Sequence, residues 1–376
     1  MVVKRLALLF CLLIPFAAQA VTTKTVYVKS DAANNGDGTT HNDAASPGAA
    51  GAYNSLANAF SGEATNLVTA DRLLVVKCLG ASADSSTPTW TGFTTDATRR
   101  IQIKCDDTSA GACHSGVWST SKYRKATSGH ATFDFTAIAN VDVIGIQAEN
   151  TGAAGDSRRV FDITSTAGSY EISGNLIRYS GAGSADPDSN CIHARGSATQ
   201  TITVYNNIIS GCFSQGIKYF PQGTSQVGIF YNNTIVNAGG DGFNADGDGT
   251  TDSLYQKNNL VYGSTGSDYS FGAGFSTTVQ TTNASEDATS PNVGLRSRTF
   301  TFVSGSDFHL GSSDTGAKDQ GTDLSADAQK AFSTDIDGQT RTGTWDVGAD
   351  ELVSTGGVLN QNNVTGGMSK ISGGSQ

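Results

Sequence analysis

One pattern occurs four times between Arg159 and Gly263: EISGNLIRYS at residues 171–180, ITVYNNIIS at 202–210, IFYNNTIVN at 229–237 and YQKNNLVYG at 255–263. Aligned on one Asn, the copies are 32, 26 and 26 residues apart, and an aliphatic residue follows each Asn at the same offset. The aligned residues are Asn175, Asn207, Asn233 and Asn259, followed by Ile177, Ile209, Ile235 and Val261. A constant period of this size indicates a repeat architecture.

A second set of short apolar segments keeps nearly the same period: FDIT at 161–164, CIHA at 191–194, GIKY at 216–219 and GFNA at 242–245. Two strand families in one period, separated by turn-forming residues, predict a parallel β-solenoid with coils of about 26 residues. A leucine-rich repeat would need regularly spaced Leu, which this chain lacks. The predicted fold is therefore all-β, a right-handed parallel β-helix of about ten coils, its hand following from the crossover rule.

Alternation within the second set predicts which side chains face outward. One outward column contains Asp162, His193, Lys218 and Asn244, and a neighbouring one contains Thr164, Arg195, Phe220 and Asp246. Coils stack at roughly 4.8 Å, so each column should bring together residues that are far apart in the sequence.

The two ends of the chain differ from the repeat. Residues 1–20 combine Lys4 and Arg5, an apolar run and an Ala-Gln-Ala site, which predicts a secretory signal peptide. The β-helix domain is predicted over 21–353, with an N-terminal cap at about 25–70 that includes the amphipathic stretch 53–64. Residues 354–376 are rich in Gly, Ser and Asn and are predicted to be a flexible tail.

Composition and charge limit the cellular compartments and the classes of partner that fit this sequence. The signal peptide predicts a secreted protein, periplasmic or extracellular, and no later stretch is apolar enough to span a membrane. The formal net charge is −10, which argues against nucleic acid and anionic membranes as general partners.

Five cysteines follow the signal peptide, which predicts disulfides with one thiol left over. Cys105 has two candidate partners, Cys78 one coil away and Cys113 in a short loop, and Cys191 with Cys212 is a further candidate pair. The spacing of Cys and His does not match a structural zinc site.

The outward columns contain the candidate catalytic residues, which are Asp162, His193, Arg195 and Lys218. Eliminative cleavage of a uronic-acid polymer needs a base, a cation or hydrogen bonds for the substrate carboxylate, and a proton donor for the leaving oxygen. Ionisable side chains on successive coils could meet these needs. The alternative is that they are ordinary polar residues on an exposed strand.

Other residues could bind the substrate or a metal ion. The candidate substrate-binding residues are Asn244, Phe220, Trp118 and Tyr123, the last two in a stretch at 105–130 that is predicted to project from the coils. Asp246, Asp248 and Asp252 resemble the start of a calcium loop, although the closing Glu is absent and Asp-Gly pairs also form plain turns. The Asn column is predicted to be structural, while Gln256 falls at a position where the other coils have an apolar residue.

Three further segments carry a resemblance to a known family: DFHL at 307–310, DTGAKDQGT at 314–322 and DIDGQTRTGTWDVGADE at 335–351. With the phased strands and the Asn-Asn turns, they resemble the right-handed parallel β-helix proteins of the pectate-lyase-like superfamily, many of which are exported and carbohydrate-active. HSGVWSTSKYR at 114–124 is similar to segments of uncharacterised β-helix proteins from bacteriophage genomes. The catalytic signatures of pectate lyases and polygalacturonases are absent.

The resemblance implies an exported protein that binds a polysaccharide or cell-surface glycan, as a polysaccharide lyase or hydrolase acting on an acidic glycan. The alternative is a non-catalytic structural or adhesive solenoid, such as a surface or phage-tail-like fibre component. The residues alone leave the choice between enzyme and binding protein open.

Overall fold

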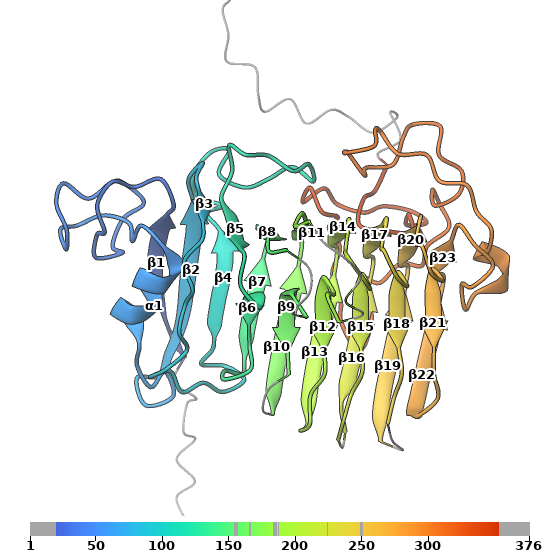
Figure 1. The fold of residues 1–376 in the computed structure, drawn as a ribbon, viewed down its shortest axis with the longest axis horizontal. Coiled ribbons are helices and arrows are strands. Elements are labelled where there is room, and N and C mark those ends of the chain that lie inside the picture. The colour runs from blue at the N-terminus through green and yellow to red at the C-terminus, as the bar shows by residue number, and fades with distance from the viewer. Residues whose placement is uncertain are drawn as a thin grey trace, which may run out of the picture.

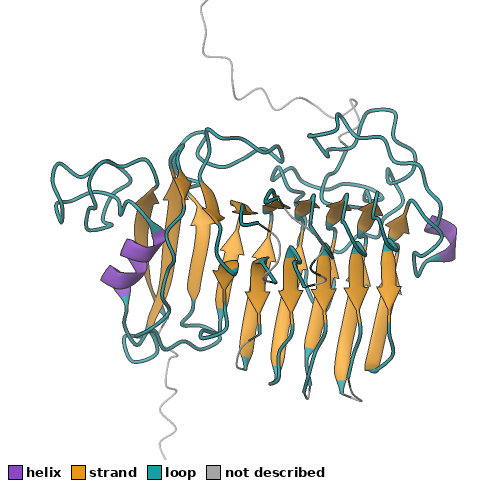
Figure 2. Ribbon diagram, in the orientation of Figure 1, coloured by secondary structure: helices purple, strands orange, loops and turns teal. Residues whose placement is uncertain are grey.

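The computed structural model describes residues 20–153, 157–164, 167–182, 186, 188–223, 225–248 and 251–352. The predicted signal peptide, apart from its last residue, and the predicted tail lie outside the described residues. Within them the chain is a parallel β-helix, whose strands lie side by side along one long axis (Figure 1). Strands dominate, and helix is confined to short pieces at the two ends (Figure 2).

Three parallel sheets form the β-helix, and the chain visits them in turn. Sheet 1 contains β1 (Thr22–Lys29), β2 (Arg72–Leu79), β4 (Ile101–Cys105), β7 (Val141–Ile144), β10 (Gly168–Ser173), β13 (Gln200–Tyr205), β16 (Val227–Tyr231), β19 (Asp252–Lys257) and β22 (Phe275–Thr281). Sheet 2 contains β3 (Ala83–Asp84), β5 (Arg124–Thr127), β8 (Gln147–Asn150), β11 (Leu176–Tyr179), β14 (Ile208–Ser210), β17 (Thr234–Val236), β20 (Leu260–Tyr262) and β23 (Ala284–Ser285). Sheet 3 contains β6 (Ala131–Asp134), β9 (Arg159–Ile163), β12 (Ile192–Ala194), β15 (Ile217–Tyr219), β18 (Phe243–Ala245) and β21 (Tyr269–Phe271).

The predicted fold class is confirmed, but the predicted number of coils is too high. The β-helix has about seven turns. Residues 286–352, here called the C-terminal segment, contain only the 3-10 helix η1 (Val293–Leu295) and isolated bridges. Instead of adding coils, they cover the outside of sheet 2 and part of the outside of sheet 1. Their Asp- and Gly-rich composition favours turns over continued strands.

Apolar side chains fill the space between the three sheets in one continuous cluster. The residues of sheet 3 that alternate with the outward columns, such as Phe161, Ile192, Ile217 and Phe243, point inward and are completely buried. Gln256 keeps the register of the coils, pairing with Phe230 on one side and Gln280 on the other. It is therefore a polar side chain turned inward, and its Oε1 accepts a hydrogen bond from Gln280 Nε2 at 2.8 Å.

The predicted Asn column forms a hydrogen-bonded ladder at the corner between sheets 1 and 2. Asn233 shows the repeating arrangement: its Nδ2 donates to Val204 O at 2.9 Å and to Asn259 Oδ1 at 3.0 Å. Its Oδ1 accepts from the backbone N and the Nδ2 of Asn207, at 3.2 and 3.0 Å. The ladder runs further than predicted, because Asn283 continues it beyond Asn259.

The residue before each ladder Asn turns the chain. Asn206, Asn232 and Asn258 have φ of 53°, 48° and 56°, a left-handed conformation that Asn tolerates better than most residues. Their side chains face the C-terminal segment: Nδ2 of Asn206 donates to Thr334 O at 2.6 Å, and that of Asn232 donates to Gly348 O at 2.9 Å. The second Asn of each Asn-Asn pair thus joins neighbouring coils, and the first Asn joins the coil to the C-terminal segment.

The N-terminal end is covered by the predicted helix, α1 (Leu56–Glu63), which lies beside β1 (Figure 1). Ser55 caps it, and its apolar side packs on the core through Leu56 and Phe60. Two of the candidate disulfides are present, Cys105–Cys113 and Cys191–Cys212. Cys78 is a buried free thiol, so the alternative Cys78–Cys105 pairing is wrong.

The Asn ladder generates the first prediction. Asn233→Ala should lower the free energy of unfolding by about 2–4 kcal/mol, because it leaves several buried donors and acceptors without partners. Asn42→Ala, in an exposed loop, should change it by less than about 0.5 kcal/mol. Urea denaturation of both variants measures the difference, and equal effects would contradict a stabilising ladder.

Candidate functional site

The residues of the predicted outward column lie in one row across adjacent strands of sheet 3. Asp162, His193, Lys218 and Asn244 pair in register on β9, β12, β15 and β18. The next column follows the strand ends, where the backbone N–H of Phe220 donates to Ala194 O and that of Asp246 donates to Tyr219 O. Seven side chains of this face line a cavity of ≈ 250 Å³, here called the trough: Asp188, His193, Arg195, Lys218, Phe220, Asn244 and Asp246.

Asp162 and His193 were expected to be exposed, and both are buried. Asp162 is covered by Arg159, which donates from Nη1 to its Oδ2 at 2.7 Å and whose Nε lies 3.4 Å from Asp188 O. Asp162 does not line the trough. Its Oδ1 lies 3.2 Å from His193 Nδ1, so it orients the imidazole and leaves Nε2 as the nitrogen that can exchange a proton.

The charges around this pair act on both groups. Burial lowers the pKa of His193, and Arg159 and Lys218 lower it further, against the opposing effect of the hydrogen bond that His193 makes to Asp162. Burial would raise the pKa of Asp162, but the hydrogen bond to His193 and the charge of Arg159 bring it below its ordinary value. At neutral pH the pair is therefore a neutral imidazole beside a carboxylate, a combination suited to a general base.

Two cations border the trough. Lys218 Nζ lies 2.6 Å from Asp188 Oδ1, and this hydrogen bond lowers the pKa of Asp188. Arg195 is exposed, and its Nε donates to Gln222 Oε1 at 2.8 Å. Sequence reasoning missed Asp188 and Arg159, because neither belongs to a repeating column. The one available signal was that Asp188 lies just before the strand that carries His193.

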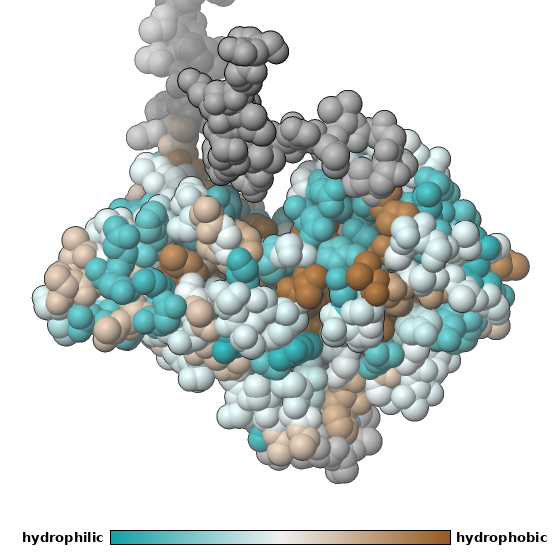
Figure 3. Space-filling model, turned by 90° about the horizontal axis from the view of Figure 1, so that it is seen from above, coloured by the Kyte–Doolittle hydropathy of each residue, from teal (hydrophilic) through white to brown (hydrophobic). Residues whose placement is uncertain are grey.

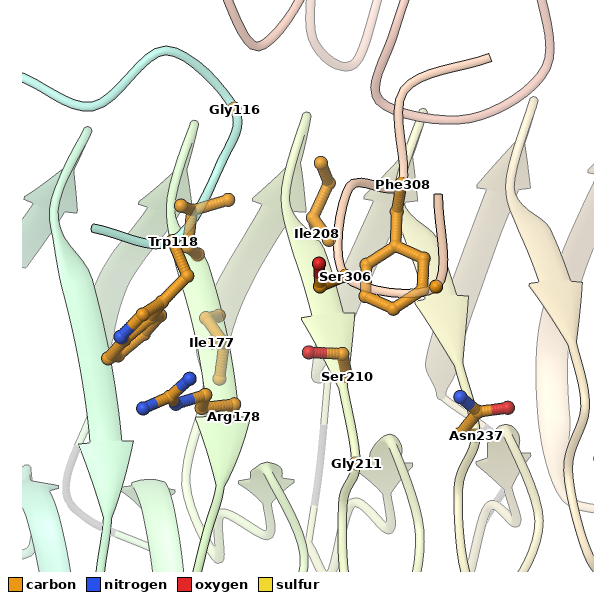
Figure 4. Close-up of a pocket in the computed structure, with 12 residues that line it drawn as sticks. Gly116, Trp118, Ile177, Arg178, Ile208, Ser210, Gly211, Asn237, Ser306 and Phe308 are labelled. Carbon is orange, nitrogen blue, oxygen red and sulfur yellow. The ribbon is translucent and has the colours of Figure 1, made fainter. Parts of the chain in front are cut away.

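The two aromatic residues predicted from the 105–130 stretch do not reach the trough. The prediction that Tyr123 is exposed is wrong: the stretch re-enters the β-helix at β5, and Tyr123 is buried with its OH 2.9 Å from Asp84 Oδ2. Trp118 lies on a different face, over sheet 2, where the guanidinium of Arg178 stacks 3.7 Å from its ring centre (Figure 4). Phe220 is the predicted aromatic residue that does line the trough.

The three aspartates of the predicted calcium loop have different surroundings. Asp246 lines the trough, Asp248 is exposed, and Asp252 is buried at the start of β19. Burial raises the pKa of Asp252, and the nearby Asp248 raises it further. Residues 249 and 250 of the loop lie outside the described residues, and calcium binding here stays a prediction.

Of the described residues, only His309, Asp337 and Asp350 form a group of three whose ligand atoms lie within 4.8 Å of one another. His309 Nδ1 bonds Asp307 at 2.5 Å, and Nε2 lies 3.2 Å from Asp337. Burial would lower the pKa of His309, but Asp337 and Asp307 raise it to about 9. A divalent cation would fit these groups by type, and a protonated imidazole between carboxylates explains them equally well.

Comparison with protein-family models, with curated proteins and with solved structures finds no match. The resemblance to the pectate-lyase-like superfamily is therefore shown only at the level of a parallel β-solenoid. The described helices are too short or too polar to cross a membrane. The two disulfides are typical of proteins from an oxidising compartment.

His309 gives a pH-dependent prediction. Because its pKa is raised from 6.5 to about 9, its contribution to stability is complete below pH 6.5 and is lost as the pH rises through about 9. The unfolding free energy of the wild type, relative to His309→Gln, should fall across this window by at most about 1.4 kcal/mol per pH unit. Urea denaturation of both proteins at several values from pH 6 to 10 measures this fall in unfolding free energy. A difference between the two proteins that stays constant over this pH range would contradict the raised pKa of His309.

Proposed function

We propose that this protein is an exported glycan-active β-helix whose trough binds an acidic polysaccharide and cleaves it by β-elimination. The observation that carries the proposal is the buried Asp162–His193 pair directly beside Lys218 and Arg195. This arrangement places His193, an oriented and neutral base, beside two cations in one hollow of a protein that carries a net negative charge. These are the groups that elimination from a uronic acid requires.

The reaction assigns one role to each side chain. Arg195 holds the uronate carboxylate, which makes the proton on the adjacent ring carbon more acidic. His193 Nε2 removes that proton as the bond to the neighbouring glycosidic oxygen breaks and a carbon–carbon double bond forms. Lys218 protonates the leaving oxygen and is reprotonated from solvent, to which His193 also returns its proton. Asp162 positions His193 and stabilises the imidazolium without touching the substrate.

A non-catalytic adhesive solenoid is the second candidate. One observation favours it: Lys218 is already held by Asp188 at 2.6 Å, which opposes its role as a proton donor. In that case Arg195 and Phe220 would bind the glycan through charge and ring stacking, with no bond broken.

Incubation with polygalacturonate, alginate, hyaluronan and chondroitin sulfate, with and without a chelator, tests the proposal. At least one of them should yield products with unsaturated ends. His193→Gln and Lys218→Ala should each slow product formation by about 100-fold or more, as expected for loss of a general acid or base. Lys104→Ala, which removes a partly exposed lysine from sheet 1, is the matched control and should retain full activity.

Other outcomes have distinct meanings. Binding that Arg195→Ala weakens, without any cleavage, would favour the adhesive protein over the lyase. Products that carry new reducing ends but no double bond would indicate hydrolysis. If the protein neither binds nor cleaves any of these acidic polysaccharides, the proposal is rejected. Loss of activity with the chelator, restored by calcium, would support the predicted role of Asp246, Asp248 and Asp252.

A further inference from the structure

A second hollow, here called the cleft, lies over sheet 2. Its walls come from segments far apart in sequence: Trp118 from the stretch before β5, and Phe308 from the C-terminal segment (Figure 4). The outward residues Leu176, Ile208 and Ser210 of β11 and β14 also line it. Its volume is ≈ 250 Å³. Seen from above, this face of the molecule is hollowed near its middle, with hydrophobic residues close by (Figure 3).

The walls of the cleft are held in place by their own contacts. Arg178 stacks on Trp118, and the backbone N–H next to this ring, that of Ser119, donates to Gln147 Oε1 at 2.6 Å. On the other side, the ring of Phe308 packs edge-on against Phe302 with 5.7 Å between centroids. The shape of the cleft is therefore fixed before any ligand arrives, which reduces the entropy cost of binding.

The chemistry of the lining favours an uncharged ligand. Arg178 is the only charged residue among those that line the cleft, and Glu149 neutralises it at 2.7 Å. The remaining polar side chains are Ser210, Asn237 and Ser306, which offer hydroxyl and amide groups. The indole N–H of Trp118 is buried, has no acceptor among the described residues and lies on the side of the ring turned away from Phe308, so a ligand in the cleft would contact the ring and not this donor (Figure 4).

We infer that the cleft is a second saccharide site and that it takes a neutral sugar ring. Aromatic and aliphatic walls suit the C–H faces of a pyranose, and the hydroxyl and amide groups suit its hydroxyls. The volume is below the roughly 300–1,000 Å³ of sites for drug-sized ligands, so one ring fits better than a longer segment. The choice of a sugar rests on the proposed glycan function, and the preference for a neutral one rests on the lining alone.

Tryptophan fluorescence can test the inference in the intact protein. Trp90 and Trp345 are 8% and 2% exposed, so a change on adding sugar should report mainly on Trp118. The probes are neutral gluco-, galacto-, manno- and xylo-oligosaccharides, with oligogalacturonate as the acidic comparison. At least one neutral series should give a saturable change, with an affinity about tenfold or more above that of the acidic series.

The variants assign the change to the cleft. Trp118→Phe should abolish the fluorescence signal, and Phe308→Ala should weaken binding by about tenfold. Ser210→Tyr should fill the hollow and prevent binding while the melting temperature stays close to that of the wild type. Phe271→Ala, which removes an exposed aromatic ring from the last coil, is the matched control and should bind normally.

The failures of the two proposals can be told apart. Calorimetry with oligogalacturonate, compared between wild type and Arg195→Ala, reports on the trough independently of tryptophan. Neutral sugar binding without binding of acidic glycan would support the cleft and count against the trough. The inference is overturned if no neutral series gives a saturable change, if Phe308→Ala binds as well as wild type, or if the acidic series binds the cleft more tightly.

Discussion

The hydrogen-bonded ladder of Asn side chains is the interaction on which the rest of this structure depends. Each internal rung uses its amide to join the coil before it and the coil after it, so a shift of one coil by one residue would leave several buried polar groups without partners. That penalty holds the coils in register. Only in this register do His193 on β12 and Lys218 on β15 become neighbours, so the trough follows from the ladder.

The Asn-Asn pairs also connect the repeat to the part of the chain that does not repeat. The first Asn of each pair faces outward and bonds the backbone of the C-terminal segment, and the buried Arg341 reaches Asn206 Oδ1 at 3.2 Å from the other side. These contacts hold the C-terminal segment against the corner between sheets 1 and 2. Phe308 belongs to this segment, so the same corner of the β-helix that stabilises the coils also positions one wall of the cleft.

The period in the sequence was sufficient to predict the strands, their faces and the Asn column, because each of these depends on residues that recur at a fixed spacing. It could not predict which outward residues are covered. Asp162 is buried by Arg159, and Tyr123 is buried because its stretch returns to the β-helix at β5. Asp188 and Phe308 also lie outside the repeat. Their positions depend on how irregular segments pack, and periodicity carries no information about that packing.

Both candidate sites arise where an irregular segment meets a regular sheet, and this division explains how they can differ in chemistry. Sheet 3 presents a row of ionisable residues on adjacent strands, and the irregular stretch before β12 adds Asp188 beside this row. Sheet 2 presents Leu176 and Ile208, and the two segments beside them add aromatic rings. The Asn ladder and the apolar core hold the coils together from the inside, so the outward residues can differ from one face to the next. One β-helix can therefore offer a charged trough, for which we propose an acidic glycan, and a nearly uncharged cleft, for which we propose a neutral sugar.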